Sequence, residues 1–213
     1  MPAGPLPDLP VAAAGGAFAS AVIMAAWRCS PRAGNGDRVN HWIGSLLILY
    51  VPDVSDEGKT RIRLADEADA AVIAHIHMTS RSASMPYLPP QKRSHEQVTR
   101  WVRDVLLRQC RTWVAVRDAE ITGYAALDGD LLEHLYLRPD VRRQGIGTLL
   151  LDEVRRHSPD GVSLHVFQQN TAARAFYESR GFTVCGTSDG ERNMENLPDM
   201  TLRWAPAARG KPC

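Results

Sequence analysis

The stretch Leu131–His157, LLEHLYLRPDVRRQGIGTLLLDEVRRH, has the pattern of a strand, a glycine loop and a helix. Its first part, LLEHLYL, is a largely apolar run of strand length, and Pro139 cannot continue a central strand because proline lacks an N–H group. Leucines recur at helical spacing after Gly147. The amino end of a helix exposes free N–H groups and the positive end of the helix dipole. Because glycines let a ligand approach this backbone, the stretch predicts a site for an anion such as phosphate or pyrophosphate.

The residues of this loop exclude two common nucleotide-binding motifs. The chain contains no Gly-x-x-x-x-Gly-Lys-Ser/Thr sequence of a P-loop, and Leu150 stands where a dinucleotide fingerprint has its third glycine. The pattern present is Arg142-x-x-Gly145-x-Gly147 between a strand and a helix. It resembles the acetyl-CoA pyrophosphate motif of the GNAT superfamily of N-acetyltransferases. An ordinary tight turn from strand to helix has the same pattern, so this motif alone does not decide the family.

A second stretch, Asn170–Phe182 (NTAARAFYESRGF), carries the same resemblance. Asn170 is a good N-cap, and Gly181 is well suited to end the helix. Asn170 and Tyr177 share one helix face because they are seven residues apart. The pattern is similar to the GNAT helix that flanks the thioester end of acetyl-CoA. The alternative is an amphipathic helix with a tyrosine in the core.

The other segments indicate a mixed α/β fold, and the family resemblance covers residues 60–204. We expect a twisted, mostly antiparallel sheet whose strands at Leu131 and Val162 form a parallel central pair, with helices on both faces. Capping and glycine signals predict helices that begin at Asp66, Ser94, the glycine loop and Asn170. Alternation and turn signals predict strands at residues 60–64, 112–116, 121–127, 131–137, 162–167, 182–187 and 200–204.

Length and composition indicate one domain with an appendage. The chain has 213 residues and a formal net charge of +1, which gives no basic footprint for nucleic acid. Its four cysteines are far apart and lack the spacing of a zinc site, so no metal is expected. We divide the chain into an atypical extension at residues 1–58, expected to be disordered or loosely packed, an acetyltransferase domain at residues 59–205, and a tail at residues 206–213.

Two other interpretations of the extension stay open. The run Val11–Trp27 is apolar, but it is only weakly hydrophobic and lies at the lower length limit for a membrane span. The preceding Met1–Pro10 lacks the basic residues of a secretory signal. A membrane-associating segment and a packed accessory element are therefore alternatives, and we expect a cytoplasmic protein without membrane partners.

The resemblance implies acetyl-CoA as the acetyl donor and no metal cofactor. It implies that loop amides and arginines hold the pyrophosphate, and that the strand edge before the loop pairs with the pantetheine arm like an extra strand. The same edge would polarise the thioester carbonyl, and an asparagine would bind the cofactor. The positions with these implied roles are Leu135, Leu137, Arg142, Arg143, Gln144, Gly145, Ile146, Gly147, Thr148 and Asn170.

Acetyl transfer also needs one group that removes a proton from the amine and one that protonates the CoA sulfur. We assign the acid role to Tyr177, whose alternative role is packing against pantetheine. For the base we favour Glu133, acting directly or through a water. His165 on the neighbouring strand is the alternative base, since histidine has an unperturbed pKa of about 6.5. An enzyme that uses the neutral fraction of its amine needs no base.

Two loops, Ser80–His95 and Ser188–Asp199, are expected to form the acceptor site. The second loop has an excess of acidic residues, which would attract a cationic amine. We therefore expect transfer of an acetyl group to a primary amine of an unidentified, small cationic acceptor. A peptide or protein N-acetyltransferase and a non-catalytic acyl-CoA-binding module are the alternatives, and the sequence leaves a homodimer undecided.

Overall fold

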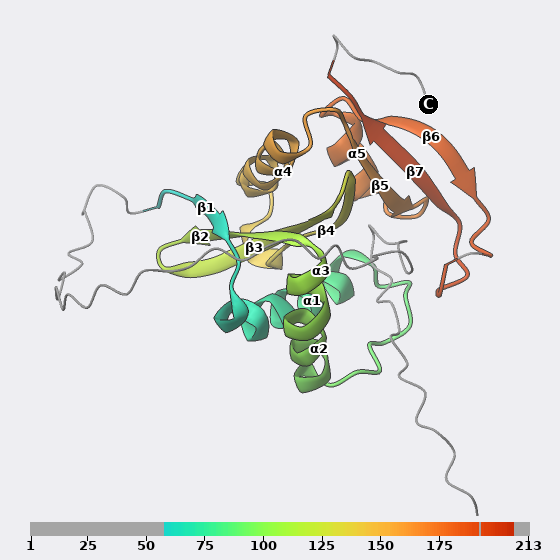
Figure 1. Ribbon diagram of the computed structural model, residues 1–213. Helices are drawn as coiled ribbons and strands as arrows, with labels where there is room; N and C mark the ends of the chain where they lie inside the picture. The colour runs from blue at the N-terminus through green and yellow to red at the C-terminus, as the bar shows by residue number, and fades with distance from the viewer. Residues whose placement is uncertain (1–57, 192, 207–213) are drawn as a thin grey trace, which may run out of the picture.

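The computed structural model describes residues 58–191 and 193–206 (Figure 1). Nearly all of the predicted extension at residues 1–58 and of the predicted tail at residues 206–213 lies outside this part. The described chain forms a seven-stranded sheet of order β1-β2-β3-β4-β5-β7-β6. The strands are β1 (Arg61–Leu64), β2 (Arg111–Arg117), β3 (Glu120–Asp128), β4 (Leu131–Leu137), β5 (Val162–Phe167), β6 (Thr183–Ser188) and β7 (Asp199–Trp204).

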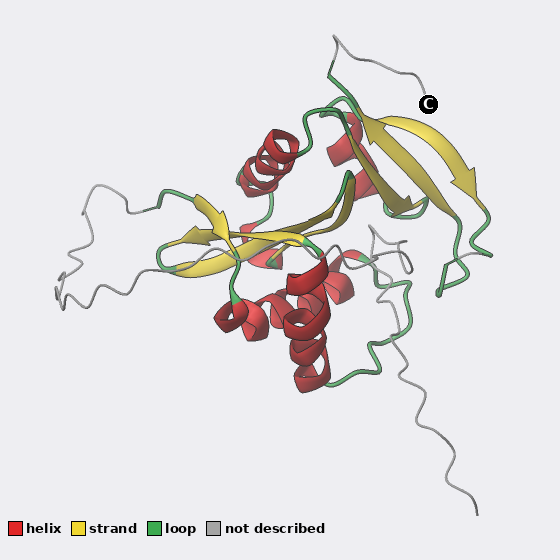
Figure 2. Cartoon of the chain, viewed as in Figure 1, coloured by secondary structure: helices red, strands yellow, loops and turns green. Residues whose placement is uncertain are grey.

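Helices cover both faces of this sheet, as Figure 2 shows in red against the yellow strands. Helices α4 and α5 pack on one face, and α1, α2 and α3 pack on the other. All neighbouring strands are antiparallel except β4 and β5, so the predicted mixed sheet with one parallel central pair is confirmed. The helices are α1 (Ala70–Ser84), α2 (His95–Trp101), α3 (Leu107–Gln109), α4 (Ile146–His157) and α5 (Thr171–Glu178).

Helix starts follow the capping residues seen in the sequence. Ser94 and Gln97 form a capping box, in which each side chain accepts a hydrogen bond from the backbone N–H of the other residue. The helix after Ser94 is less regular than predicted, because a π-helical turn at Val102–Leu106 separates α2 from α3. Helix α1 also extends further, so the predicted Ser80–His95 loop begins only at Met85. The helix continues to that point because its first breaker is Pro86.

Strands β4 and β5 part almost at once. Their ladder holds one residue pair, Leu131 with Ser163, and then the strands diverge. On its other side β4 pairs with β3, but the register shifts so that Ala126 and Leu127 pair with His134 and Leu132. Glu133 is therefore the extra residue of a β-bulge, which interrupts the alternation predicted for this strand. The parting of β4 and β5 leaves one edge of β4 without a strand partner from the described chain.

Two buried histidines lie on the face of the sheet covered by α1 and α2. His77 and His134 are 1% and 3% exposed, and their ring centroids are 5.5 Å apart. The Nδ1 atom of His77 is 2.8 Å from the hydroxyl oxygen of Tyr124. Burial, aided by the charge of Arg81, lowers the pKa of His77 to about 3. Burial also lowers the pKa of His134 well below its usual value.

We expect His77 to make the fold sensitive to acid. The unfolded chain takes up a proton on His77 near pH 6.5, whereas the folded protein keeps it neutral down to about pH 3. Stability is therefore lost as pH falls below 6.5. Between about pH 7.5 and 5.5, wild type should lose about 1.4 kcal/mol more unfolding free energy than His77→Gln, measured by urea denaturation. The comparison cancels contributions that both proteins share, and parallel pH curves would contradict the prediction.

Neither a membrane span nor a metal centre is found in the described residues. No helix within residues 58–191 and 193–206 combines the length and apolar character needed to cross a bilayer. The same residues bring together no group of three His, Cys, Asp or Glu side chains able to hold a metal ion. The membrane-associating alternative for Val11–Trp27 concerns residues outside these ranges.

Candidate active site

A cavity of about 610 Å³ lies where β4 and β5 part. Its walls come from β4, the glycine loop, the start of α4, the length of α5 and the carboxyl end of α1. The glycine loop, three arginines and a tyrosine therefore face one space. The lining residues are Ser80, Ala83, Ser84, Leu135, Tyr136, Leu137, Arg142, Arg143, Gly145, Gly147, Thr148, Asn170, Ala172, Ala173, Ala175, Phe176, Tyr177, Ser179 and Arg180.

The glycine loop brings backbone to the cavity surface. Gly145 is the N-cap of α4 and has a φ of +84°, which residues with a side chain rarely adopt. A Cβ atom on Gly147 would be 3.3 Å from the ring of Phe176, a tight contact that would require the ring to shift by a few tenths of an ångström. In the first turn of α4, the N–H group of Thr148 donates to the carbonyl of Gly145, whereas those of Ile146 and Gly147 have no carbonyl partner in the described chain. Together with the helix dipole, they form a site suited to an anion.

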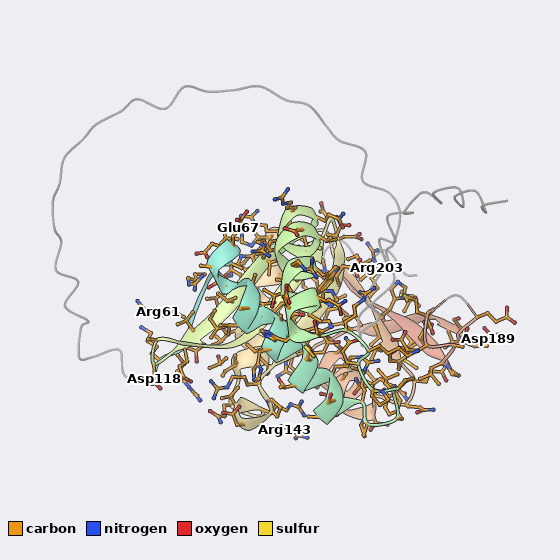
Figure 3. The ribbon with its side chains drawn as sticks, turned by 90° about the horizontal axis from the view of Figure 1, so that it is seen from below. Arg61, Glu67, Asp118, Arg143, Asp189 and Arg203 are labelled. Carbon is orange, nitrogen blue, oxygen red and sulfur yellow. The ribbon has the colours of Figure 1, made fainter. Side chains whose placement is uncertain are left out.

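Arginines add positive charge beside these N–H groups. Arg142 donates a 2.8 Å hydrogen bond to the hydroxyl of Ser84, at the end of α1, and a 3.5 Å bond to the carbonyl of Ser80. Burial lowers the pKa of Arg142. Figure 3 shows Arg143 at the rim of the molecule, far from Asp189 on the acidic loop. No carboxylate lines the cavity within the described residues, so the charged side chains of its lining are all arginines.

Helix α5 positions Asn170 and Tyr177 on the opposite wall. Asn170 is 5% exposed, and its side-chain oxygen accepts a 3.2 Å hydrogen bond from the N–H of Ala173, which confirms the predicted N-cap. Tyr177 is 2% exposed and packs against the rings of Phe176 and Phe182. Its hydroxyl makes no hydrogen bond to the described residues, and burial raises its pKa well above the usual value. The phenol therefore keeps its proton at neutral pH.

The two candidate bases lie outside this lining. Glu133 is 7% exposed, and burial followed by the nearby charge of Asp128 raises the pKa of its carboxyl to about 7. His165 on β5 is half-buried, and its Nδ1 atom is 3.1 Å from the hydroxyl of Thr201. Burial lowers the pKa of His165, although Asp199 partly counteracts this. Of the two, Glu133 has the more strongly shifted pKa, in the range a base at neutral pH needs.

The cavity unites most, but not all, of the predicted cofactor positions. The side chain of Gln144 turns away to Arg117 and to the carbonyl of Asp140, and Ile146 is in the apolar core under α4. Gln144 and Ile146 are predicted to bind the cofactor through their backbone N–H groups, and this prediction does not depend on where their side chains lie. Predicted residues that line the cavity are Leu135, Leu137, Arg142, Arg143, Gly145, Gly147, Thr148, Asn170 and Tyr177.

Several lining residues were missed in the sequence. Phe176 and Arg180 are near neighbours of Tyr177, and Arg180 is the basic residue just before Gly181. A basic residue at the end of this helix, close to the glycine loop's expected ligand, could have been recognised in the sequence as a candidate for binding an anion. No sequence signal indicates Ser80 and Ser84 of α1. These serines approach the glycine loop only because of how α1 packs across the sheet.

The two predicted acceptor loops are joined through Arg81 on α1. Its guanidinium donates a 2.9 Å hydrogen bond to the carbonyl of Pro89 and lies 3.7 Å from a carboxylate oxygen of Glu195. Both side chains are about 10% exposed, and burial raises the pKa of Glu195. A second cavity of about 610 Å³ lies beside the β6–β7 loop and is lined by polar residues that include Asp189 and Glu191. The charged side chains that line the second cavity are thus carboxylates, whereas those that line the first are arginines.

Comparisons with known proteins agree with this arrangement. Residues 108–184 match a family model described as an acetyltransferase (GNAT) domain. The chain is 40% identical to the peptidyl-lysine N-acetyltransferase YjaB of Salmonella typhimurium over 97 residues, which are 45% of this chain and 66% of the relative. It is 30% identical to YjaB of Escherichia coli, spanning 47% of this chain and 69% of that protein. The PaiA N-acetyltransferase of Thermoplasma acidophilum, solved in complex with coenzyme A, has the same fold, with a TM-score of 0.54, 20% identity, and coverage of 70% of this chain and 99% of that one.

Proposed function

Because this chain belongs to the GNAT superfamily of N-acetyltransferases, we propose that it transfers an acetyl group from acetyl-CoA to a primary amine. The observation that carries the proposal is the cavity between β4 and α5. It combines a glycine loop at a helix amino end, an arginine-rich and carboxylate-free wall, and a buried tyrosine. The glycine loop and the arginines suit the pyrophosphate of acetyl-CoA, and the buried tyrosine suits its thioester.

The cofactor is held along the open edge of β4. Its pyrophosphate binds the amides of residues 144–148 together with Arg142 and Arg143. Its pantetheine arm pairs with the backbone of Leu135 and Leu137, and the side-chain N–H₂ group of Asn170 completes the contacts. This pose places the thioester at the Tyr177 end of the cavity.

The reaction then needs two proton transfers. Glu133 removes a proton from the acceptor amine, directly or through a water, as the nitrogen attacks the thioester carbonyl. A β4 N–H group stabilises the resulting oxyanion. When the C–S bond breaks, Tyr177 donates its proton to the sulfur, giving the acetamide and free CoA. Glu133 returns its proton to solvent, and Tyr177 regains one from it.

For the acceptor we propose a lysine side chain in a peptide or protein. The support is that the YjaB relatives are peptidyl-lysine N-acetyltransferases. The acidic residues beside the second cavity, Asp189 and Glu191, favour a cationic acceptor. The same acidic residues keep a small polyamine as the second candidate. We also propose that the acetyltransferase domain begins at residue 59 and ends at residue 205.

The first test is binding of acetyl-CoA to the full chain by calorimetry. Wild type should bind with micromolar affinity, and the double variant Arg142→Ala/Gly145→Glu should bind at least about 100-fold more weakly, because it loses a cation and adds a repelling carboxylate. The matched control is Arg156→Ala/Gly129→Glu. Gly129, like Gly145, has a positive φ and open space around its Cα, but it lies outside the cavity. No binding by folded wild type would overturn the proposal.

The acceptor is tested separately by release of free CoA thiol. Peptides with one lysine and an acetylated amino terminus should be turned over with a higher kcat/KM than spermidine. The same peptides with the lysine replaced by norleucine should be inert. Higher turnover of spermidine than of every lysine peptide would instead favour the small-amine candidate.

A further inference from the structure

Arg180 is held over the cavity by a set of neutral partners. Its Nε and Nη2 atoms donate hydrogen bonds of 3.1 and 2.6 Å to the hydroxyl of Thr148, in the first turn of α4. Its Nη1 atom donates to the carbonyl of Phe176 at 3.1 Å and to the hydroxyl of Ser179 at 2.9 Å. The guanidinium also stacks over the Phe176 ring, 4.0 Å from its centroid. The side chain is therefore fixed in place although it forms no ion pair with the described residues.

This position is electrostatically unfavourable for a cation without an anionic ligand. The amino end of α4 already carries the positive end of the helix dipole. Arg142 and Arg143 lie beside the same turn, and neither has a carboxylate partner in the described chain. A pyrophosphate diester supplies about two negative charges against these three arginines. A phosphomonoester on the same ligand adds about 1.5 to 2 more at neutral pH, so the charge of the wall matches three phosphates better than two.

Arg180 also approaches the loop from a different side. The side chain of Arg142 is hydrogen-bonded to α1, whereas the side chain of Arg180 is hydrogen-bonded to the end of α5 and to α4. The pyrophosphate of the proposed cofactor is accounted for by the loop amides with Arg142 and Arg143. The nucleotide end of the ligand must continue beyond the pyrophosphate, away from β4 and the thioester. Of the three arginines that line the cavity, Arg180 is the one not assigned to the pyrophosphate, so it is available for a phosphate at the nucleotide end of the ligand.

We propose that Arg180 binds the ribose 3′-phosphate of the acyl-CoA and makes the protein selective for 3′-phosphorylated CoA over 3′-dephospho-CoA. This inference rests on the proposed function, because it assumes that the cavity takes CoA. Arg180 is then a specificity-determining residue of cofactor binding. Its bonds to Thr148 and Phe176 hold the guanidinium in position before the ligand arrives, which reduces the entropy lost on binding.

The test compares two ligands and two proteins by calorimetry with the full chain. Wild type should bind CoA about 10- to 100-fold more tightly than 3′-dephospho-CoA, the range of one charge-assisted contact. Arg180→Gln should bind both ligands with about equal affinity, close to that of wild type for 3′-dephospho-CoA. Arg180→Lys should recover part of the preference. Arg174→Gln is the control, because Arg174 is also on α5 but does not line the cavity.

Each contrary result has a distinct meaning. If Arg180→Gln keeps the wild-type preference for CoA, another group binds the 3′-phosphate and the inference is wrong. If the variant loses equal affinity for both ligands, Arg180 serves the pyrophosphate or the packing of α5, which also overturns it. If folded wild type binds neither ligand, the proposed function fails and this inference fails with it.

Discussion

Replacing Tyr177 with phenylalanine is expected to lower kcat about 10²- to 10⁴-fold while the Kd for acetyl-CoA changes less than about twofold. The expelled thiolate has an ordinary pKa of about 8.5, and the apolar surroundings that raise the pKa of Tyr177 also disfavour a bare thiolate. A protonated phenol within reach of the sulfur removes this penalty, because charge never has to develop fully on the leaving group. Phenylalanine keeps the ring packing but has no proton to give.

The measurement is a single-turnover assay, which separates chemistry from product release. Stability should hardly change, because the Tyr177 hydroxyl has no hydrogen-bond partner in the described chain to lose. Tyr124→Phe is the matched control. It removes a buried hydroxyl bonded to His77 and should cost about 1 kcal/mol of stability without lowering kcat. A single-turnover rate for Tyr177→Phe within threefold of wild type would remove the tyrosine from the mechanism.

The second large effect is expected for Glu133→Gln, which should reduce kcat/KM about 100-fold above pH 7 and change its pH dependence. A base acts only when deprotonated, and the pKa of Glu133 is raised to about 7. In wild type, a plot of log kcat/KM against pH should therefore have one unit more slope below about pH 7 than above it. The variant should lose this break and keep only the slope due to the acceptor amine.

The alternative base is tested by the same profile. His165→Gln should retain the break near pH 7, since Glu133 is intact. A break that disappears in His165→Gln and persists in Glu133→Gln would transfer the role to the histidine. A break that persists in both variants would assign it to another titrating group, whereas a wild-type profile with no break near pH 7 would indicate an enzyme that draws on the neutral fraction of its amine.

Local signals in the sequence were sufficient for much of this architecture. Helix starts at Ser94 and Asn170 depend on hydrogen bonds within a few residues, so the capping residues alone predict them. Strand β5 was predicted with its observed ends, because an apolar run lies between a glycine turn and polar residues. The family resemblance added the parallel pair, which alternation alone does not reveal.

Features that depend on a distant partner could not be predicted. The bulge at Glu133 comes from the register of β4 against β3, and no property of β4 itself indicates it. The raised pKa of Glu133 follows from the resulting burial. The contacts of Arg142 with Ser84 and of Arg180 with Thr148 join residues far apart in the chain, and only the packing of the helices brings them together.

The strand order β5-β7-β6 affects the timing of assembly during synthesis on the ribosome. Strand β7 is the last of the seven described strands to be made, yet it lies between β5 and β6 and pairs with both. Met200 and Leu202 of β7 belong to the same apolar cluster as Tyr177. Strands β1 to β4 can pair in the order in which they leave the exit tunnel, each beside the one before it. The nascent chain is thus expected to hold a formed glycine loop while Tyr177 still lacks its packing partners on β7, until Trp204 has emerged.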